Sequence, residues 1–173
     1  MASSLTCSRI VAAALAASII GMAAAKADIL QISGTGLIRH QGTETDDATV
    51  VEGVLRPNVN QGRYYVPVVF PRDGERVCRF TLIYRDINNA ESMIVRLLRK
   101  TFKVGNDAFV PPVVMASLQT AAGVLDAVRR ATTANITQAA IKTTNSFYFI
   151  EVQVPSFNID ILGFQVEVAP ACG

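Results

Sequence analysis

The chain has 173 residues, of which 50% are hydrophobic and only 17% are charged, which excludes a chain that is disordered throughout. Its length supports one domain and is too short for two independent cores. No collagen-like period and no repeat of about 20–50 residues occurs, so fibrous and solenoid architectures are excluded as well.

Residues 1–27 have the pattern of an export signal. A polar start that carries Arg9 is followed by an uncharged apolar run, Ile10 to Ala25, and then by Ala25-Lys26-Ala27, an A-x-A cleavage site. The run has 16 residues, fewer than the roughly 20 that a membrane-spanning helix needs. We therefore expect a cleaved signal peptide, with a membrane anchor as the alternative, and a secreted or periplasmic protein in which residues 28–173 form a single domain.

Cleavage at this site changes the charge balance of the chain. It removes two of the 16 basic residues and none of the 14 acidic ones, so the mature chain is formally neutral. Nucleic-acid binding needs a basic surface, and the only local excess is Arg96, Arg99, Lys100 and Lys103. We interpret these four residues as the solvated side of a strand and its turn, and expect no nucleic-acid partner.

Two cysteines, Cys78 and Cys172, remain after removal of the leader, which contains Cys7. An even pair in an exported chain usually closes a disulfide, and two free buried thiols are the alternative. The bridge would close a loop of about 95 residues, worth on the order of 4 kcal/mol in the chain-entropy model. Two thiols with no His near either of them in sequence make an incomplete zinc site.

Short β-strands are the dominant pattern after the leader. In the N-terminal segment, residues 28–62, the signal is weak, and strands are expected at Ile29–Ile32 and Thr49–Leu55. A clear strand begins at Arg63 with RYYVPVVF, in which Pro67 indicates an edge position or a bulge. Residues 63–173 are therefore predicted to form the core of the sandwich.

Four further segments refine this prediction. The turn PRDGE precedes RVCRFTLIYRD, in which Cys78, Phe80, Leu82 and Tyr84 share one face. The next strand, MIVRLLRKTF, follows a polar loop, and FYFIEVQVP and FQVEV alternate in the last third, separated by a turn at SFNIDILG. If the last strand lies antiparallel beside the Cys78 strand, it brings Cys172 toward Cys78. The pattern is typical of an all-β, antiparallel, jelly-roll-like sandwich.

The segment VVMASLQTAAGVLDAVRRATTANI is ambiguous. Propensity favours an Ala-rich amphipathic helix over Val113 to Ala131, interrupted at Gly123, rather than a strand, a loop and a second strand. A short helix near residues 118–131 is the helical form that the predicted fold keeps open.

Four stretches, in order along the chain, resemble a β-sandwich module of exported bacterial proteins with no assigned function. They are VVFPRDGERVCRFTLIYRD, MIVRLLRK, ATTANITQAAIKTTNSFYFIEVQVP and ILGFQVEV. The resemblance covers about Val66 to Val168 and is carried by these positions: Pro71, Gly74, Tyr84, Asp86, Arg96, Leu97, Arg99, Ile136, Ala139, Ile141, Asn145, Tyr148, Leu162 and Gly163. It implies strand–loop–strand for the ambiguous segment, although AAGVLDAVRR departs from the family pattern and keeps a short helix open. It implies no catalytic residue.

Recognisable catalytic groups are missing from the sequence. The single His, His40, lies in a weakly patterned region, and the adjacent Asp46 and Asp47 lie in a polar loop where their carboxylates need not converge. No nucleophile-elbow, P-loop or dinucleotide-binding motif occurs. We therefore expect no enzyme and no cofactor.

Two groups of residues are candidates for binding. Asp86, Asn88, Asn89 and Glu91 place oxygen ligands in one short loop, which could hold Ca²⁺ or simply form a turn. The candidates for stacking on a ligand are four aromatic residues: Tyr64, Tyr65, Phe147 and Phe149. Packing between the sheets is their alternative role, whereas exposure in one patch would mark a binding surface.

The sequence thus predicts an exported, non-catalytic β-sandwich with a structural, adhesive or binding role. A carbohydrate-binding module is the first alternative and requires two or more exposed aromatics on one face. A Ca²⁺-stabilised module and an unrecognised hydrolase with convergent carboxylates are the others. A glycan or a protein is the expected partner, and the oligomeric state stays open.

Overall fold

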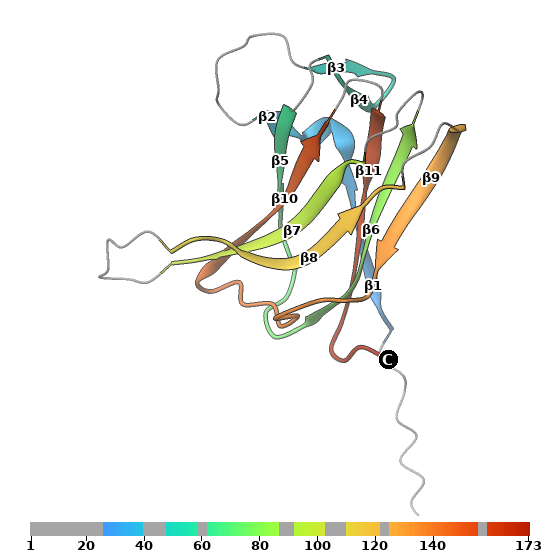
Figure 1. Ribbon diagram of the computed structural model, residues 1–173. Coiled ribbons are helices and arrows are strands. Elements are labelled where there is room, and N and C mark those ends of the chain that lie inside the picture. The colour runs from blue at the N-terminus through green and yellow to red at the C-terminus, as the bar shows by residue number, and fades with distance from the viewer. Residues whose placement is uncertain are drawn as a thin grey trace, which may run out of the picture.

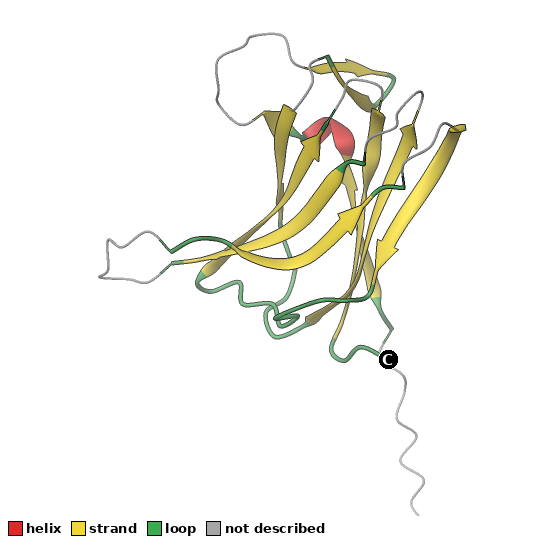
Figure 2. Ribbon diagram, viewed as in Figure 1, coloured by secondary structure: helices red, strands yellow, loops and turns green. Residues whose placement is uncertain are grey.

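The computed structural model describes residues 26–39, 48–58, 62–86, 92–102, 110–121, 125–155 and 159–173. Two antiparallel sheets face each other across a hydrophobic core (Figure 1). The only helical element in these ranges is one 3-10 turn, η1 (Gly34–Gly36), which Figure 2 shows in red. None of the helical structure described is long and apolar enough to span a membrane. The predicted all-β sandwich is therefore confirmed.

The first sheet has six strands in the part of the chain that is described. They are β1 (Asp28–Ser33), β3 (Ala48–Val51), β4 (Val54–Pro57), β6 (Arg76–Asp86), β9 (Leu125–Thr133) and β11 (Ile159–Ala169). The order is β3-β4-β11-β6-β9, and β1 also pairs with β11, on the edge that β4 occupies farther along. The long central strands β6 and β11 hold this six-stranded sheet together.

The second sheet has five described strands in the order β2-β5-β10-β7-β8. They are β2 (Ile38–Arg39), β5 (Gly62–Val68), β7 (Ile94–Thr101), β8 (Val113–Gln119) and β10 (Ser146–Val154). β2 pairs with β5 only at Tyr64 and Tyr65, so Pro67 lies where the free edge of β5 begins. This position tolerates a residue that cannot donate a backbone hydrogen bond, as the sequence predicted.

The alternation read from the sequence determines which side chains enter the core. Phe80, Leu82 and Tyr84 on β6 are buried. Val95 and Leu97 on β7 are buried too, and so is Met93 just before that strand. The largest fully buried side chains come from both sheets: Tyr64, Phe80, Phe164, Leu82, Met93, Leu97, Met115, Ile141, Ile150, Ile159 and Ile161. Burying this apolar surface between two layers is the main stabilising contribution to the fold.

The ambiguous segment folds as two strands. β8 pairs with β7 and buries Met115, Ala116 and Leu118, whereas β9 pairs with β6 at the edge of the other sheet. The helix near residues 118–131 is therefore wrong, because pairing with β6 and β7 outweighs local helix propensity. Strand–loop–strand is confirmed for the described ranges.

Two boundaries near the chain ends differ from the prediction. The expected strand Thr49–Leu55 is two strands, β3 and β4, because Glu52 and Gly53 form a turn with positive φ angles of 51° and 81°. The turn expected in SFNIDILG is wrong in part, since Ile159–Gly163 belongs to β11, with a register shift between Ile161 and Gly163.

The end of β11 lies beside the start of β6, as expected from the sequence. β11 lies antiparallel to β6, and Val168 is opposite Val77. Cys78 and Cys172 are joined by a disulfide, with 5.2 Å between their Cα atoms. The bridge ties the last residues of the chain to the first part of β6.

Candidate functional site

The side of the five-stranded sheet that points away from the core carries three of the four aromatic candidates, Tyr65, Phe147 and Phe149. We call this surface the five-stranded face. Residues opposite one another in the register share this side: Phe149 lies between Pro67 and Leu98, and Glu151 lies between Tyr65 and Arg96. Of these six, Leu98 and Glu151 are buried although neither is part of the hydrophobic core, so the surface around them is well packed.

Two pairs of aromatic rings lie on this face. Phe102 and Phe147 meet edge to face with 4.5 Å between ring centroids, and their exposed fractions are 46% and 65%. Tyr65 and Phe149 are half-buried and tilted against each other, with 5.7 Å between centroids. Such pairs hold their rings in place, so the exposed ring faces form a fixed apolar surface.

A polar cluster lies beside the rings. The Glu151 carboxylate accepts hydrogen bonds from the Tyr65 hydroxyl at 2.9 Å, Arg96 Nη1 at 2.8 Å and Gln153 Nε2 at 3.0 Å. Burial raises the pKa of Glu151, but the bonds from Tyr65 and Arg96 outweigh it, so the pKa lies below its ordinary value. Burial and the bond to Glu151 raise the pKa of Tyr65, which keeps its hydroxyl a donor.

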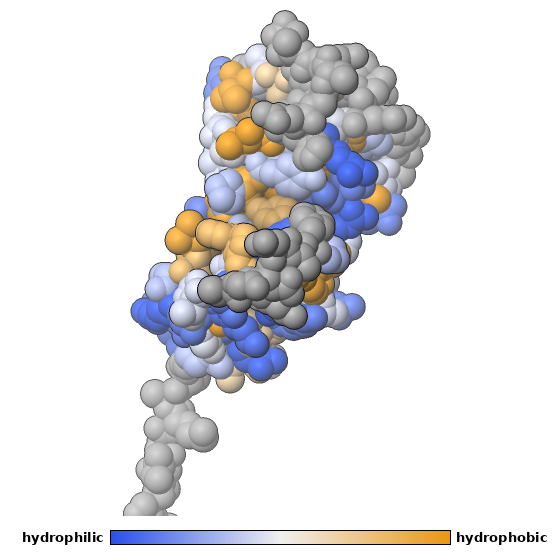
Figure 3. Space-filling model, turned by 90° about the vertical axis from the view of Figure 1, so that its left-hand side faces the viewer, coloured by the Kyte–Doolittle hydropathy of each residue, from blue (hydrophilic) through white to orange (hydrophobic). Residues whose placement is uncertain are grey.

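The five-stranded face has a hollow near each end of β10. One, of about 440 Å³, is lined by Arg63, Ile94 and Gln153 among others. The second, of about 270 Å³, is lined by Phe102, Phe147 and the Thr143–Ser146 turn. Figure 3 looks onto this side of the molecule and shows hydrophobic residues from its upper left to its middle, with hydrophilic ones at the right and below. The rings therefore occupy a surface that runs between two hollows.

The four aromatic candidates do not share one role. Tyr64 is in the core, with only 1% of its surface exposed, because it alternates with Tyr65 along β5. Tyr65, Phe149 and Phe147 lie together on the outer side. The sequence analysis missed Phe102, Glu151 and Arg96 as members of this surface, although the alternation of β7 and β10 was the signal that could have found them.

The structure describes only one of the four candidate calcium ligands. Asp86 is fully buried at the end of β6, whereas Asn88, Asn89 and Glu91 lie outside the described residues. Among the residues that are described, no three His, Cys, Asp or Glu side chains gather as a metal site would require.

Four other residues considered in the sequence analysis also lie outside the described residues. They are His40, Asp46, Asp47 and Lys103.

Within the basic group, Arg96 binds Glu151, and Arg99 donates to the carbonyl of Ala140 and to Gln138. Lys100 is half-buried and lies opposite Phe147. Arg96 and Arg99 are therefore held by specific neighbours instead of being fully solvated.

Comparison with known proteins gives the architecture. No protein-family model and no curated protein matches the sequence. Two solved structures have the same fold at a TM-score of 0.50 each. The C-terminal family 6 carbohydrate-binding module of LamC, a marine laminarinase from Zobellia galactanivorans, is 13% identical over 80% of this chain and 98% of its own. The second, a family 15 xylan-binding module, is 8% identical over 83% of this chain and 98% of its own. At these identities the likeness shows that this chain shares their β-sandwich fold.

Proposed function

We propose that this protein is a non-catalytic glycan-binding β-sandwich and that its five-stranded face takes the sugar rings. The observation that carries the proposal is the placement of two aromatic pairs on one outer face: Phe102 with Phe147, and Tyr65 with Phe149. The sequence analysis required two or more exposed aromatics on one face for this function. The fold shared with two carbohydrate-binding modules agrees with it.

The ring pairs supply apolar surface of the right kind. The C–H faces of a pyranose ring are apolar and pack against aromatic faces, while its hydroxyls stay at the edge. Phe147 is 65% exposed and is held edge to face by Phe102, so little conformational freedom is lost when a sugar ring stacks on it.

The polar cluster supplies donors and acceptors for sugar hydroxyls. Glu151 is a carboxylate whose position is fixed by Tyr65, Arg96 and Gln153, so the cluster is oriented before any ligand arrives. A few fixed polar groups beside an apolar surface are what a ligand site needs for orientation and specificity.

The same cluster argues against glycoside hydrolysis at this face. Hydrolysis needs two carboxyl groups on opposite sides of the scissile bond. Among the described residues on the outer side of these strands, Glu151 is the single carboxylate, and its bonds lower its pKa rather than raising it as a general acid would require. We therefore propose binding without catalysis, in a secreted or periplasmic setting consistent with the leader sequence and the disulfide.

Affinity electrophoresis of the purified protein through gels that contain different neutral polysaccharides tests the proposal. We expect retardation by at least one polysaccharide and at least about fivefold weaker binding for Phe147→Ala, since stacking of a ligand ring on one aromatic side chain contributes about 1–3 kcal/mol. Val50→Ala is the matched control, because Val50 is 56% exposed on β3 of the other sheet.

Two results would overturn this proposal. One is the absence of retardation by every polysaccharide in a broad panel. The other is a dimer in sedimentation experiments that Phe147→Ala dissociates, which would make the same apolar face a protein interface.

A further inference from the structure

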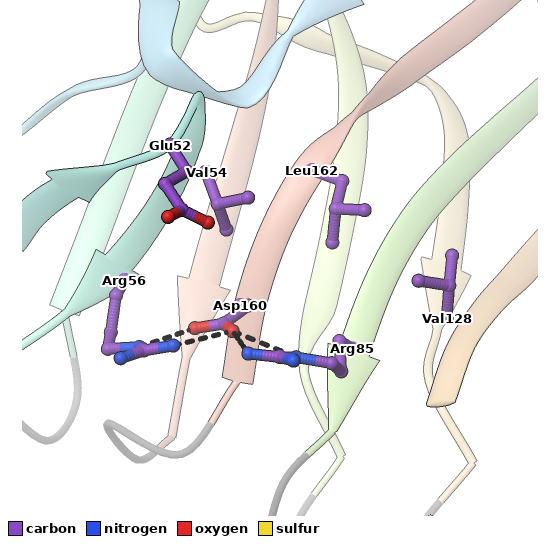
Figure 4. Close-up of a pocket in the computed structure, with 7 residues that line it drawn as sticks. All are labelled: Glu52, Val54, Arg56, Arg85, Val128, Asp160 and Leu162. Carbon is purple, nitrogen blue, oxygen red and sulfur yellow. Dashed lines mark hydrogen bonds and ion pairs between the residues drawn. The ribbon is translucent and has the colours of Figure 1, made fainter. Parts of the chain in front are cut away.

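The outer side of the six-stranded sheet contains a further hollow with a different chemistry. It has a volume of about 190 Å³ and lies across β4, β11 and β6. Figure 4 shows Arg56 and Arg85 on either side of Asp160, with Val54, Leu162 and Val128 along the apolar part of the wall. We call this hollow the arginine pocket.

The arginine pocket is built around one buried carboxylate. Arg56 binds Asp160 through two parallel bonds, Nε to Oδ1 at 2.7 Å and Nη2 to Oδ2 at 2.9 Å. Arg85 donates from Nε and Nη2 to Oδ2 at 3.1 and 2.7 Å. The Asp160 side chain is 2% exposed, whereas those of Arg56 and Arg85 are 42% and 39% exposed. Asp160 therefore fixes both guanidinium groups and leaves them accessible.

The charge of this group is positive. The hydrogen bond from Arg56, stronger than the opposing effect of burial, holds the pKa of Asp160 below its ordinary value, so the carboxylate is ionised at neutral pH. Asp160, Arg56 and Arg85 together carry one negative and two positive charges, a net charge of +1, and the Glu52 carboxylate at the rim of the pocket opposes this charge. Arg56 has five N–H donors, of which Asp160 takes two. A guanidinium held in this way presents its remaining donors in the geometry that carboxylates and sulfates prefer.

Further positive charge lies along the same side of the sheet. A neighbouring hollow of about 330 Å³ is lined by Arg79, Arg130 and the hydroxyl-bearing Thr81 and Thr132. From Arg85 to Arg79, β6 extends about 20 Å, which is long enough for several linked sugar units. Glu167 pairs with Arg79 at 3.3 Å, so one of these charges is compensated.

We propose that the arginine pocket binds the carboxylate group of an acidic saccharide. The remaining donors of Arg56 pair with the carboxylate, and the apolar side chains Val54, Val128 and Leu162 contact the C–H face of the ring that carries it. The inference depends on the proposed function only in taking the ligand to be a saccharide, since the site lies on the opposite sheet.

A saccharide fits this surface better than a nucleic acid. Glu52 at the rim of the pocket and Glu167 farther along the sheet interrupt the row of basic side chains that a phosphate backbone would follow. The mature chain has no excess of basic residues with which to displace counterions from a phosphate backbone. The walls of the pocket are also more apolar than phosphate binding requires.

Calorimetric titration with trigalacturonate tests the inference, and the fully methyl-esterified trimer is the matched neutral ligand. We expect binding of the acid form only, weakening as salt is raised, because the contact is ionic. Arg56→Gln should weaken binding at least tenfold, and Glu52→Gln should strengthen it about threefold by removing the repulsive charge at the rim. Lys142→Gln removes one exposed charge elsewhere and should leave the affinity unchanged.

Arg130→Gln provides a second test if Arg56→Gln fails to fold, because it does not disturb the contacts of Asp160. We expect it to weaken trigalacturonate binding about threefold. Equal binding of the methyl ester, or no effect of either arginine substitution, would overturn the inference.

Titration with sodium sulfate and with single-stranded oligothymidylate completes the test. Binding of either as tightly as trigalacturonate would show a general anion site or a nucleic-acid site and overturn the saccharide assignment. Phe147→Ala should leave trigalacturonate binding intact, so failure here is distinguishable from failure of the proposed function.

Discussion

At the scale of single residues, two carboxylates organise the two outer faces. Glu151 fixes Tyr65 and Arg96 on one sheet, and Asp160 fixes Arg56 and Arg85 on the other. Each is buried and surrounded by donors, and each has a lowered pKa. Because both stay charged at neutral pH, each contributes to the stability of the fold as well as to the surface beside it.

Replacement of Asp160 should therefore destabilise the protein. Asp160→Asn removes the negative charge that both arginines contact, and we expect a loss of about 1–3 kcal/mol in the free energy of unfolding. The loss is smaller than for a wholly buried pair, because both arginines are about 40% exposed and regain some hydration. Urea unfolding measures it. Glu167→Gln, which breaks an exposed pair, is the control and should change the free energy by no more than about 0.5 kcal/mol.

The same substitution has a defined pH dependence. Since the folded-state pKa of Asp160 is lowered from its ordinary value of 3.8, its contribution is present above that value and is lost as the pH falls through the folded-state pKa. The difference between the original protein and Asp160→Asn should thus be constant between about pH 5 and 7 and shrink below 3.8. A difference that grows as the pH falls would contradict this assignment.

At the scale of elements, the alternation of β6, β7 and β10 was readable from the sequence because one side of each strand enters the core. The helix near residues 118–131 was wrong for the opposite reason. β9 has an exposed outer side with Val128 and Arg130, so its pattern is weak and its state depends on pairing with β6. Tertiary pairing of this kind is invisible to a local pattern.

The disulfide belongs to this scale, because it joins β6 to the segment after β11. Its loop spans 94 positions, and closing it stabilises the fold by about 4 kcal/mol in the chain-entropy model. We expect reduction to lower the melting temperature by roughly 10 °C or more. Thermal unfolding with and without dithiothreitol measures this.

A double variant is the control for this measurement. With Cys78→Ser and Cys172→Ser combined, the melting temperature should be low and should not respond to the reductant. Equal melting temperatures for the oxidised and reduced forms of the original protein would show that the bridge contributes nothing.

At the scale of the whole molecule, the sandwich presents two chemically distinct outer faces. One carries aromatic pairs and the other carries arginines. The first was partly predictable, since Phe147 and Phe149 alternate with buried residues in a single strand. The arginine pocket was not, because Arg56 and Asp160 are 104 positions apart and meet only through the pairing of β4 with β11.

The two proposed ligand faces lie on opposite sides of one core, and together they predict a protein that bridges two polysaccharides. Beads coated with polygalacturonate, mixed with beads that carry the neutral polysaccharide bound by the five-stranded face, should clump when the protein is added. Phe147→Ala and Arg56→Gln should each abolish mixed clumping while keeping binding to the one bead type that the intact face takes, because distant sites act independently. If either variant loses binding to both bead types, binding at the two faces is coupled or the fold is damaged. If both variants still clump the beads, the binding sites lie elsewhere.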